Sequence, residues 1–183
     1  MCGRYRIETN NKDMYDVYKI LTDDDTPYFV GDVYPSNLAP IMTANDLFPS
    51  FGKWGNESKD KKYLLINVRA ETVAEKPIFS KNFISQRCVI PCSGFYEWDS
   101  DKNKYYFTRS DGKLIYMCGF YREHGGARNF AILTKSSTPP VDQFHHRIPV
   151  ILDEHLKADY LQDAAFATDF ILQDNEVKLT YHR

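Results

Sequence analysis

Residues 87–98 read RCVIPCSGFYEW, and this stretch decides the fold class. It contains two predicted strands, 87–91 and 94–98, and further strands are predicted at 104–109, 113–121 and 129–134. The intervening segments are Asp99-Ser100-Asp101, Ser110-Asp111-Gly112 and His124-Gly125-Gly126, which consist of residue types that form tight turns. Strands joined by such turns favour pairing between neighbours along the chain. We therefore predict an antiparallel β meander over residues 87–134.

The rest of the chain predicts more strands and a few short helices. We predict strands at 3–7, 63–67, 148–152 and 177–181, and helices at 14–21, 69–72 and 154–161. The helices are predicted from apolar residues at helical spacing, and the strands from short apolar runs. The stretch through Pro35, Pro40 and Pro49 predicts an irregular loop. A chain of 183 residues is long enough for one ordinary domain, so we predict a single α+β domain over residues 1–183.

Composition excludes several classes of protein. The chain has 23 Lys and Arg against 25 Asp and Glu, a net charge of −2, which excludes nucleic-acid binding through bulk positive charge. No stretch approaches the run of about 18 apolar residues that spans a bilayer, so we expect no membrane association. The first residues lack the apolar core of a secretory signal, so we expect a cytoplasmic protein, nucleoid-associated if it is bacterial.

The four cysteines are too few and too irregularly spaced for a disulfide framework, so reduced thiols are expected. Cys88 and Cys92 would share one face of a strand, but no second pair completes a zinc site. Cys118 lies in an apolar strand and is expected to be a core residue. We therefore predict no metal and no other cofactor.

Cys2 has the most distinctive chemistry in the chain. Methionine aminopeptidases remove Met1 when the second residue is small, and the chain would then begin with cysteine. Such an end carries an amine of pKa about 8 beside a thiol of pKa about 8.5, so both nucleophiles are partly unprotonated near neutral pH. Three interpretations stay open: a buried core cysteine, an N-terminal nucleophile of the amidotransferase type, or an aminothiol that captures an aldehyde as a thiazolidine.

Other candidates carry acid/base and polar groups. Glu97 is surrounded by aromatic residues, where desolvation would raise the pKa of its carboxyl group, although an outward-facing carboxylate is the alternative. His145 and His146 precede a predicted strand, and such pairs are often ordinary surface residues. Asn67 and Arg69 share a face if their strand continues that far. Their alternatives are a turn residue and a salt-bridge partner.

Six segments together resemble the SOS-response-associated peptidase family, the abasic-site processing proteins. They are residues 1–5 (MCGRY), 37–40 (NLAP), 54–55 (WG), 67–72 (NVRAET), 87–98 (RCVIPCSGFYEW) and 145–149 (HHRIP). They occur in the family's order and cover nearly the whole chain. The amidotransferase interpretation explains only the first three residues.

The resemblance implies a β-rich α+β domain with a mostly antiparallel barrel-like sheet flanked by short helices. It also implies a DNA damage protein of the SOS response that binds single-stranded DNA containing abasic sites. Family members link a terminal cysteine covalently to the aldehyde of the abasic site through a thiazolidine, which shields the strand from cleavage. Self-processing removal of Met1 and weak AP-lyase chemistry are implied as well. We expect a monomer, and protein partners are not indicated.

By position in these motifs, the resemblance assigns four catalytic residues. Cys2 would be the nucleophile, Asn67 would hold the terminal group, Glu97 would transfer protons, and His145 would assist opening of the sugar ring. The implied DNA-binding residues are Arg4, Asn37, Pro40, Trp54, Arg69 and Arg147. The arginines match family residues that hold backbone phosphates.

Two positions depart from the family pattern. The family usually continues Trp-Gly-Leu with a Pro and a second Trp, whereas this chain has Asn56 and Glu57 after Gly55, so we expect a reduced aromatic wedge against DNA. Ile148 replaces the usual Met. An N-terminal-nucleophile hydrolase and a non-covalent single-stranded DNA binder remain alternatives, and the binder would not need Cys2.

Overall fold

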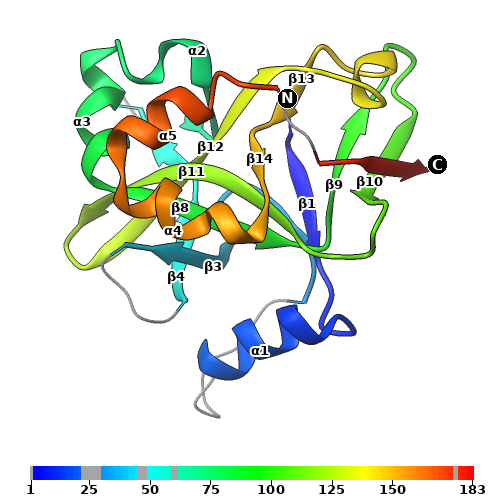
Figure 1. Ribbon diagram of the computed structural model, residues 1–183, viewed down its shortest axis with the longest axis horizontal. Helices are drawn as coiled ribbons and strands as arrows, with labels where there is room; N and C mark the ends of the chain where they lie inside the picture. Colours follow the sequence, from blue (N-terminus) through cyan, green and yellow to red (C-terminus); the bar gives the residue numbers. More distant parts are fainter. Residues whose placement is uncertain (1, 22–29, 45–48, 59–61, 175–176) are drawn as a thin grey trace.

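A computed structural model describes residues 2–21, 30–44, 49–58, 62–174 and 177–183 of the protein (Figure 1). Its strands are β1 (Arg4–Ile7), β2 (Gly31–Val33), β3 (Leu38–Thr43), β4 (Ser50–Trp54), β5 (Asn56–Glu57), β6 (Leu64–Leu65), β7 (Asn67–Arg69), β8 (Arg87–Cys92), β9 (Gly94–Trp98), β10 (Lys104–Arg109), β11 (Ile115–His124), β12 (Ala127–Ser136), β13 (Arg147–Pro149), β14 (Ile151–Leu152) and β15 (Leu179–His182). Its α-helices are α1 (Lys12–Leu21), α2 (Ala70–Val73), α3 (Pro77–Ser85), α4 (Lys157–Gln162) and α5 (Ala164–Phe170), with single 3-10 turns at Val141–Gln143 and Glu154–Leu156. This architecture confirms the predicted mixed α+β class.

Five strands close on themselves to form a barrel. The order β12-β4-β3-β8-β11 is continuous, and β11 pairs back with β12 to complete the ring. All pairings in the structure are antiparallel except β12 with β4 and β12 with β7. The mostly antiparallel, barrel-like sheet implied by the family resemblance is therefore present.

A second sheet has the order β15-β10-β9-β1-β2 and lies beside the barrel. The predicted meander is wrong at this point, because β8 belongs to the barrel while β9 belongs to the second sheet. The chain changes sheets at Ser93, whose N–H donates to Arg6 O at 2.8 Å. Glycine is required at the next position, since a Cβ on Gly94 would lie 2.5 Å from Phe107 O.

The secondary structure of the proline-rich stretch also differs from the prediction. Instead of an irregular loop, it contains β2, β3 and the start of β4. Pro40 lies inside β3 opposite Phe51 of β4, whereas β3 meets β8 only at Met42 and Thr43. Pro40 therefore has a strand neighbour on one side only, where its missing N–H is tolerated.

The helices cover the outside of the barrel (Figure 1). Helices α2 to α5 gather on one side, α1 lies at the opposite end below β1, and β9 and β10 lie to the right. The predicted helices at the start of the chain, after β7 and after β14 are confirmed, whereas α3 and α5 were not predicted. Asn11 caps α1, since its Oδ1 accepts a hydrogen bond from Asp13 N at 2.9 Å.

One apolar core joins the barrel to the second sheet. Tyr5 of β1 and Trp54 of β4 are fully buried there, with their ring centroids 5.0 Å apart. All four cysteines are buried free thiols, which confirms Cys118 as a core residue. Within the described ranges, no helix has the length and apolar character needed to cross a bilayer.

Candidate active site around Cys2

The entry of the chain into the second sheet positions Cys2. Cys2 immediately precedes β1, and its side chain is fully buried. Strand β1 pairs with β9 through Tyr5 opposite Phe95, which brings the first residues of the chain alongside the end of β9. The Cys2 carbonyl accepts a hydrogen bond from Asn67 Nδ2 at 2.8 Å, and Cys2 Sγ lies 3.6 Å from Arg4 O. The backbone and the thiol of Cys2 are thus both held in place.

Asn67 reaches this point from the barrel. It begins β7, which runs parallel to β12 with Asn67 opposite Ile132. Its side chain is buried, and its Oδ1 accepts no hydrogen bond from the residues that the structure describes. A buried acceptor without a partner is costly in free energy, so Oδ1 is suited to receive an additional donor next to Cys2.

Glu97 lies on β9 with only 1% of its surface exposed. Burial raises the pKa of its carboxyl group to about 7. Burial also raises the pKa of the Cys2 thiol well above its usual range, and the nearby charge of Glu97 raises it further. At neutral pH the thiol is therefore protonated, and Glu97 is poised to gain or lose a proton.

His145 also lies near Glu97. Its Nδ1 is 3.8 Å from Glu97 Oε2 and 3.0 Å from the backbone N of Arg147. Nδ1 also lies 3.1 Å from the Arg147 carbonyl oxygen, so the tautomer determines whether Nδ1 accepts from the N–H or donates to the carbonyl. Burial lowers the pKa of the imidazole, which favours the neutral ring. His145 also stacks on His146, with ring centroids 4.5 Å apart.

The structure therefore brings together the four residues to which the family resemblance assigns catalysis. Cys2 and Asn67 share a hydrogen bond, Glu97 acts on the thiol through its charge, and His145 faces Glu97. They come from four separate parts of the chain. Among the described residues, no group of three or more His, Cys, Asp or Glu side chains is arranged to hold a metal ion.

Two of the predicted DNA-binding residues are accessible to a ligand. Arg69, at the end of β7, is exposed. The Arg4 side chain is 25% exposed, and its guanidinium lies over the rings of Tyr34, Tyr96 and Trp98, at 4.6, 5.7 and 5.4 Å from their centroids. Arg4 is also ion-paired with Asp32, with 3.6 Å between the guanidinium and Oδ2, so its charge is partly balanced within the protein.

Of the other four predicted DNA-binding residues, three are buried, and Asn37 is partly exposed in a turn. Trp54 is fully buried, and its indole N–H donates to Ile66 O at 3.0 Å. Pro40 is buried in β3, and Asn37 Oδ1 accepts a hydrogen bond from Tyr34 N in the turn before that strand. Arg147 is buried and paired with Glu71. Core packing and turn formation account for their positions.

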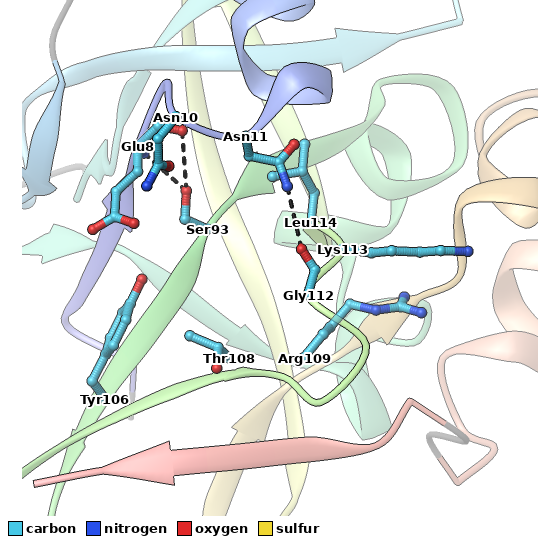
Figure 2. A pocket seen from close by; sticks show the side chains of 10 residues that line it. All are labelled: Glu8, Asn10, Asn11, Ser93, Tyr106, Thr108, Arg109, Gly112, Lys113 and Leu114. Atoms are coloured by element: carbon cyan, nitrogen blue, oxygen red, sulfur yellow. Dashed lines mark hydrogen bonds between the residues drawn. The ribbon is translucent and has the colours of Figure 1, made fainter.

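A separate cavity of about 360 Å³ lies beside Tyr106, Thr108 and Arg109 of β10 (Figure 2). The side chains of Glu8, Ser93, Tyr106 and Thr108 surround it, and Asn11 Nδ2 closes one wall by donating to Gly112 O at 3.3 Å. None of the predicted site residues lines this cavity.

The sequence analysis assigned no role to two acidic residues, Glu71 and Asp32. Glu71 lies inside the segment 67–72 that carries the family resemblance, yet its partner Arg147 is 76 positions further along the chain. Asp32 accepts hydrogen bonds from Arg6 and from Tyr96, at 2.9 and 3.0 Å. The position of Glu71 within the family motif was the signal that the sequence offered for this residue. The sequence could not reveal that Glu71 pairs with Arg147, because that pairing depends on the fold.

The fold and the site define a class of protein with a buried cysteine at the second position, flanked by an amide, a carboxylate and an imidazole on a mixed barrel. The family model for SOS response associated peptidase (SRAP) matches residues 1–182. The chain belongs to this family.

Relatives and solved structures are consistent with that assignment. The chain is 32% identical over 193 residues to the abasic site processing protein YoqW of Bacillus subtilis, covering 93% of this chain and 84% of the relative. It is 24% identical over 178 residues to the abasic site processing protein YedK of Escherichia coli, covering 88% and 80%. A crystal structure from Bordetella bronchiseptica covers 98% of both chains with a TM-score of 0.79 at 21% identity, a likeness of fold alone.

The raised pKa of Glu97 predicts a pH-dependent effect on stability. Between pH about 4.5 and about 7 the carboxyl ionises in the unfolded chain but keeps its proton in the folded one, so the folded state loses stability as pH rises. Glu97→Gln removes this loss, and its free energy of unfolding should rise relative to the parent by up to about 3 kcal/mol between pH 4.5 and pH 8.

Urea unfolding at a series of pH values measures this difference. Glu57→Gln is the matched control for loss of one carboxylate, because Glu57 is an exposed strand glutamate. A stability difference for Glu97→Gln that stays constant with pH would contradict the assignment of a raised pKa to Glu97.

Proposed function

We propose that this protein links Cys2 covalently to abasic sites in single-stranded DNA and so shields them from strand cleavage. The single observation that carries the proposal is the burial of Glu97 next to Cys2, whose carbonyl is held by Asn67. Relatives named abasic site processing proteins support the choice of substrate. An aminothiol beside a carboxylate that transfers protons near pH 7 is suited to capture an aldehyde.

The covalent step balances without a cofactor. Removal of Met1 frees the α-amine of Cys2, which attacks the aldehyde carbon of the ring-opened abasic sugar. Loss of water from the resulting carbinolamine leaves an imine. The Cys2 sulfur then adds to the imine carbon while the thiol proton ends on nitrogen, which closes a five-membered thiazolidine. Consumption of the imine prevents the β-elimination that would otherwise cut the strand.

Glu97 and His145 have different roles in this scheme. Glu97, with a pKa of about 7, accepts a proton from the terminal amine or thiol and returns it when water leaves. His145, whose neutral form is favoured by burial, assists opening of the sugar ring and thereby raises the fraction of reactive aldehyde. The same two groups can run the steps backward, which would release the protein and would allow weak AP-lyase chemistry.

Self-processing is the remaining part of the proposal. The family name refers to a peptidase, and Cys2 is the nucleophile nearest the bond between residues 1 and 2. We propose that, where methionine aminopeptidase has not already removed Met1, the Cys2 thiol passes its proton to Glu97 and its sulfur attacks the Met1 carbonyl carbon. The bond from that carbon to the Cys2 nitrogen breaks, the nitrogen takes up the proton to become the free α-amine, and water hydrolyses the resulting thioester, which releases Met1 and restores the thiol.

Contacts to the DNA strand come from few residues. Arg69 is exposed and Arg4 partly so, whereas Arg147 is occupied by Glu71. With a net charge of −2, such local contacts give modest and salt-sensitive binding to undamaged single strands.

Adduct formation should require both nucleophiles of Cys2. Cys2→Ala is expected to form no heat-stable adduct with single-stranded DNA bearing one abasic site, because it has no thiol to close the ring. Once Met1 is removed, Cys2→Ala and Cys2→Ser both keep the α-amine, so each should give only an imine, detectable after borohydride reduction. Denaturing gels measure both. Cys88→Ala, which removes another buried thiol, is the control, and an undiminished heat-stable adduct from Cys2→Ala would refute the thiazolidine.

Arg69 should contribute one phosphate contact. Arg69→Ala is expected to flatten the slope of log affinity against log salt for single-stranded DNA by about 0.7, the effect of one lost contact. Fluorescence anisotropy across a salt series measures the slope. Lys157→Ala on α4, where the lysine pairs with Glu154, should leave it unchanged. A parental slope for Arg69→Ala would place the DNA elsewhere on the surface.

The two proton-transfer residues should be separable by kinetics. His145→Ala is expected to slow crosslinking by up to about 10²-fold with full yield at long times, because the ring opens slowly without its help. Glu97→Ala should slow release of the adduct in a chase with excess competing abasic DNA. A release rate equal to that of the parent would make Glu97 a structural carboxylate instead.

A further inference from the structure

Four aromatic rings pack together between the C-terminal strand and the loop that carries His145. The centroid of the Phe144 ring lies 4.1 Å from that of Tyr105, 5.8 Å from that of Phe107 and 4.8 Å from that of Tyr181. The Tyr181 ring also lies 6.0 Å from Tyr105 and 5.9 Å from Phe107. Aromatic rings at such separations attract one another in addition to burying apolar surface. We call these four residues the aromatic wall.

The register of the second sheet places the wall beside Glu97. Tyr105 of β10 is directly opposite Glu97 of β9, and Phe107 of β10 is directly opposite Tyr181 of β15. Residues opposite each other in antiparallel strands project to the same face of the sheet, with their Cβ atoms about 5 Å apart. Tyr105 therefore lies next to Glu97, and Tyr181 lies one strand further out on the same face.

The fourth ring reaches the wall from the loop before β13. Phe144 directly precedes His145, whose Nδ1 is 3.8 Å from Glu97 Oε2. Glu97 is thus flanked by Tyr105 from its own sheet and by the segment of Phe144 and His145 from this loop. The stacking of Phe144 on Tyr105 closes the space between the sheet and the loop beside the carboxyl group.

Exposure increases across the wall towards its outer side. Glu97 is 1% exposed and Phe107 is fully buried, whereas Tyr181 is 40% exposed. Strand β15 is the edge of the second sheet and pairs only with β10, so Tyr181 is the outermost ring (Figure 1). Burial is the largest cause of the raised pKa of Glu97, so water that passed the wall would lower this pKa.

Several titratable groups face Glu97 from the elements around it. The Cys2 thiol comes from the segment before β1, and the His145 imidazole comes from the loop before β13. On the sheet itself, the Tyr105 hydroxyl donates to Asp99 Oδ2 at 3.2 Å. A substitution of Phe144 or Tyr181 retains all of these groups, so it tests the access of water without removing a neighbouring charge.

We propose that Phe144 and Tyr181 are positioning residues of the candidate site, which act with Tyr105 to keep water from the Glu97 carboxyl group. The C-terminal strand is then part of the site. Neither Phe144 nor Tyr181 lies in the six segments that carry the family resemblance. The inference rests on the proposed function for its effect on crosslinking, but its effect on Glu97 is independent of any reaction.

The experiment compares Tyr181→Ala, Tyr181→Phe, Phe144→Leu and the control Thr180→Ala in the full chain. Thr180 is an exposed residue of the same strand, and it projects to the opposite face of the sheet from Tyr181. Carbon-13 NMR follows the side-chain carboxyl signal of Glu97 against pH, and Glu97→Gln identifies this signal. Thermal unfolding verifies that each variant is folded.

Tyr181→Ala and Phe144→Leu should each move the ionisation midpoint of Glu97 from near pH 7 to lower pH, by about 1, because water gains access to the carboxylate. Tyr181→Phe keeps the ring and Thr180→Ala keeps the whole wall, so both should retain the parental midpoint. A parental midpoint in either folded Tyr181→Ala or folded Phe144→Leu would overturn the inference. An equal decrease in Tyr181→Phe or in Thr180→Ala would overturn it as well.

Crosslinking gives a second measurement that separates this inference from the proposed function. If Glu97 acts as a base, the crosslinking rate falls below its midpoint, so this fall should occur at lower pH in Tyr181→Ala than in the parent. If the parent forms no adduct, the proposed function fails, yet the NMR midpoints still decide whether the wall shields Glu97. Crosslinking by a parent whose Glu97 midpoint is unaffected by Tyr181→Ala would leave the proposed function intact and reject the wall.

Discussion

The burial of one carboxylate, Glu97, is the constraint on which the site depends. Water is excluded from it by the packing of the second sheet against the barrel, and this exclusion alone moves its pKa into the neutral range. The same burial keeps the Cys2 thiol protonated, and the nearby charge of Glu97 adds to this effect. A more open sheet would leave an ordinary, fully ionised glutamate and no acid/base partner for Cys2.

Strand β12 provides the frame that makes this arrangement rigid. It takes part in closing the barrel and also carries β7 on one side and β13 on the other. Asn67 begins β7, and His145 lies in the loop two residues before β13, so both belong to segments attached to a common strand, and the Glu71–Arg147 pair connects these segments a second time. This attachment restricts the positions of the two side chains, as proton transfer requires.

Local patterns in the sequence predicted most strands from β8 onward, but they missed β2, β3 and β4. They also failed to predict how the strands combine, since the turn at Ser110-Asp111-Gly112 leads from β10 to β11, which lie in different sheets. The turn residues before β10 and β12 predicted two hairpins that exist, β9 with β10 and β11 with β12. The change of sheet at Ser93 depends on a close approach between Gly94 and Phe107 that no local signal reveals. The family motifs predicted four residues that do converge, because such motifs retain chemistry. The interior positions of Trp54 and Arg147 depend on partners distant in the chain, so one sequence cannot supply them.

The proposed function depends on a covalent bond between Cys2 and the abasic sugar, and mass spectrometry can identify where the sugar is attached. The adduct with abasic single-stranded DNA is digested with nuclease and trypsin, and the remaining sugar is located by tandem mass spectrometry. We predict that the sugar fragment lies on the peptide of residues 2–4, that Met1 is absent, and that the Cys2 sulfur is protected from alkylation. A sugar fragment on a lysine, or on Cys2 with an alkylatable thiol, would contradict the thiazolidine mechanism.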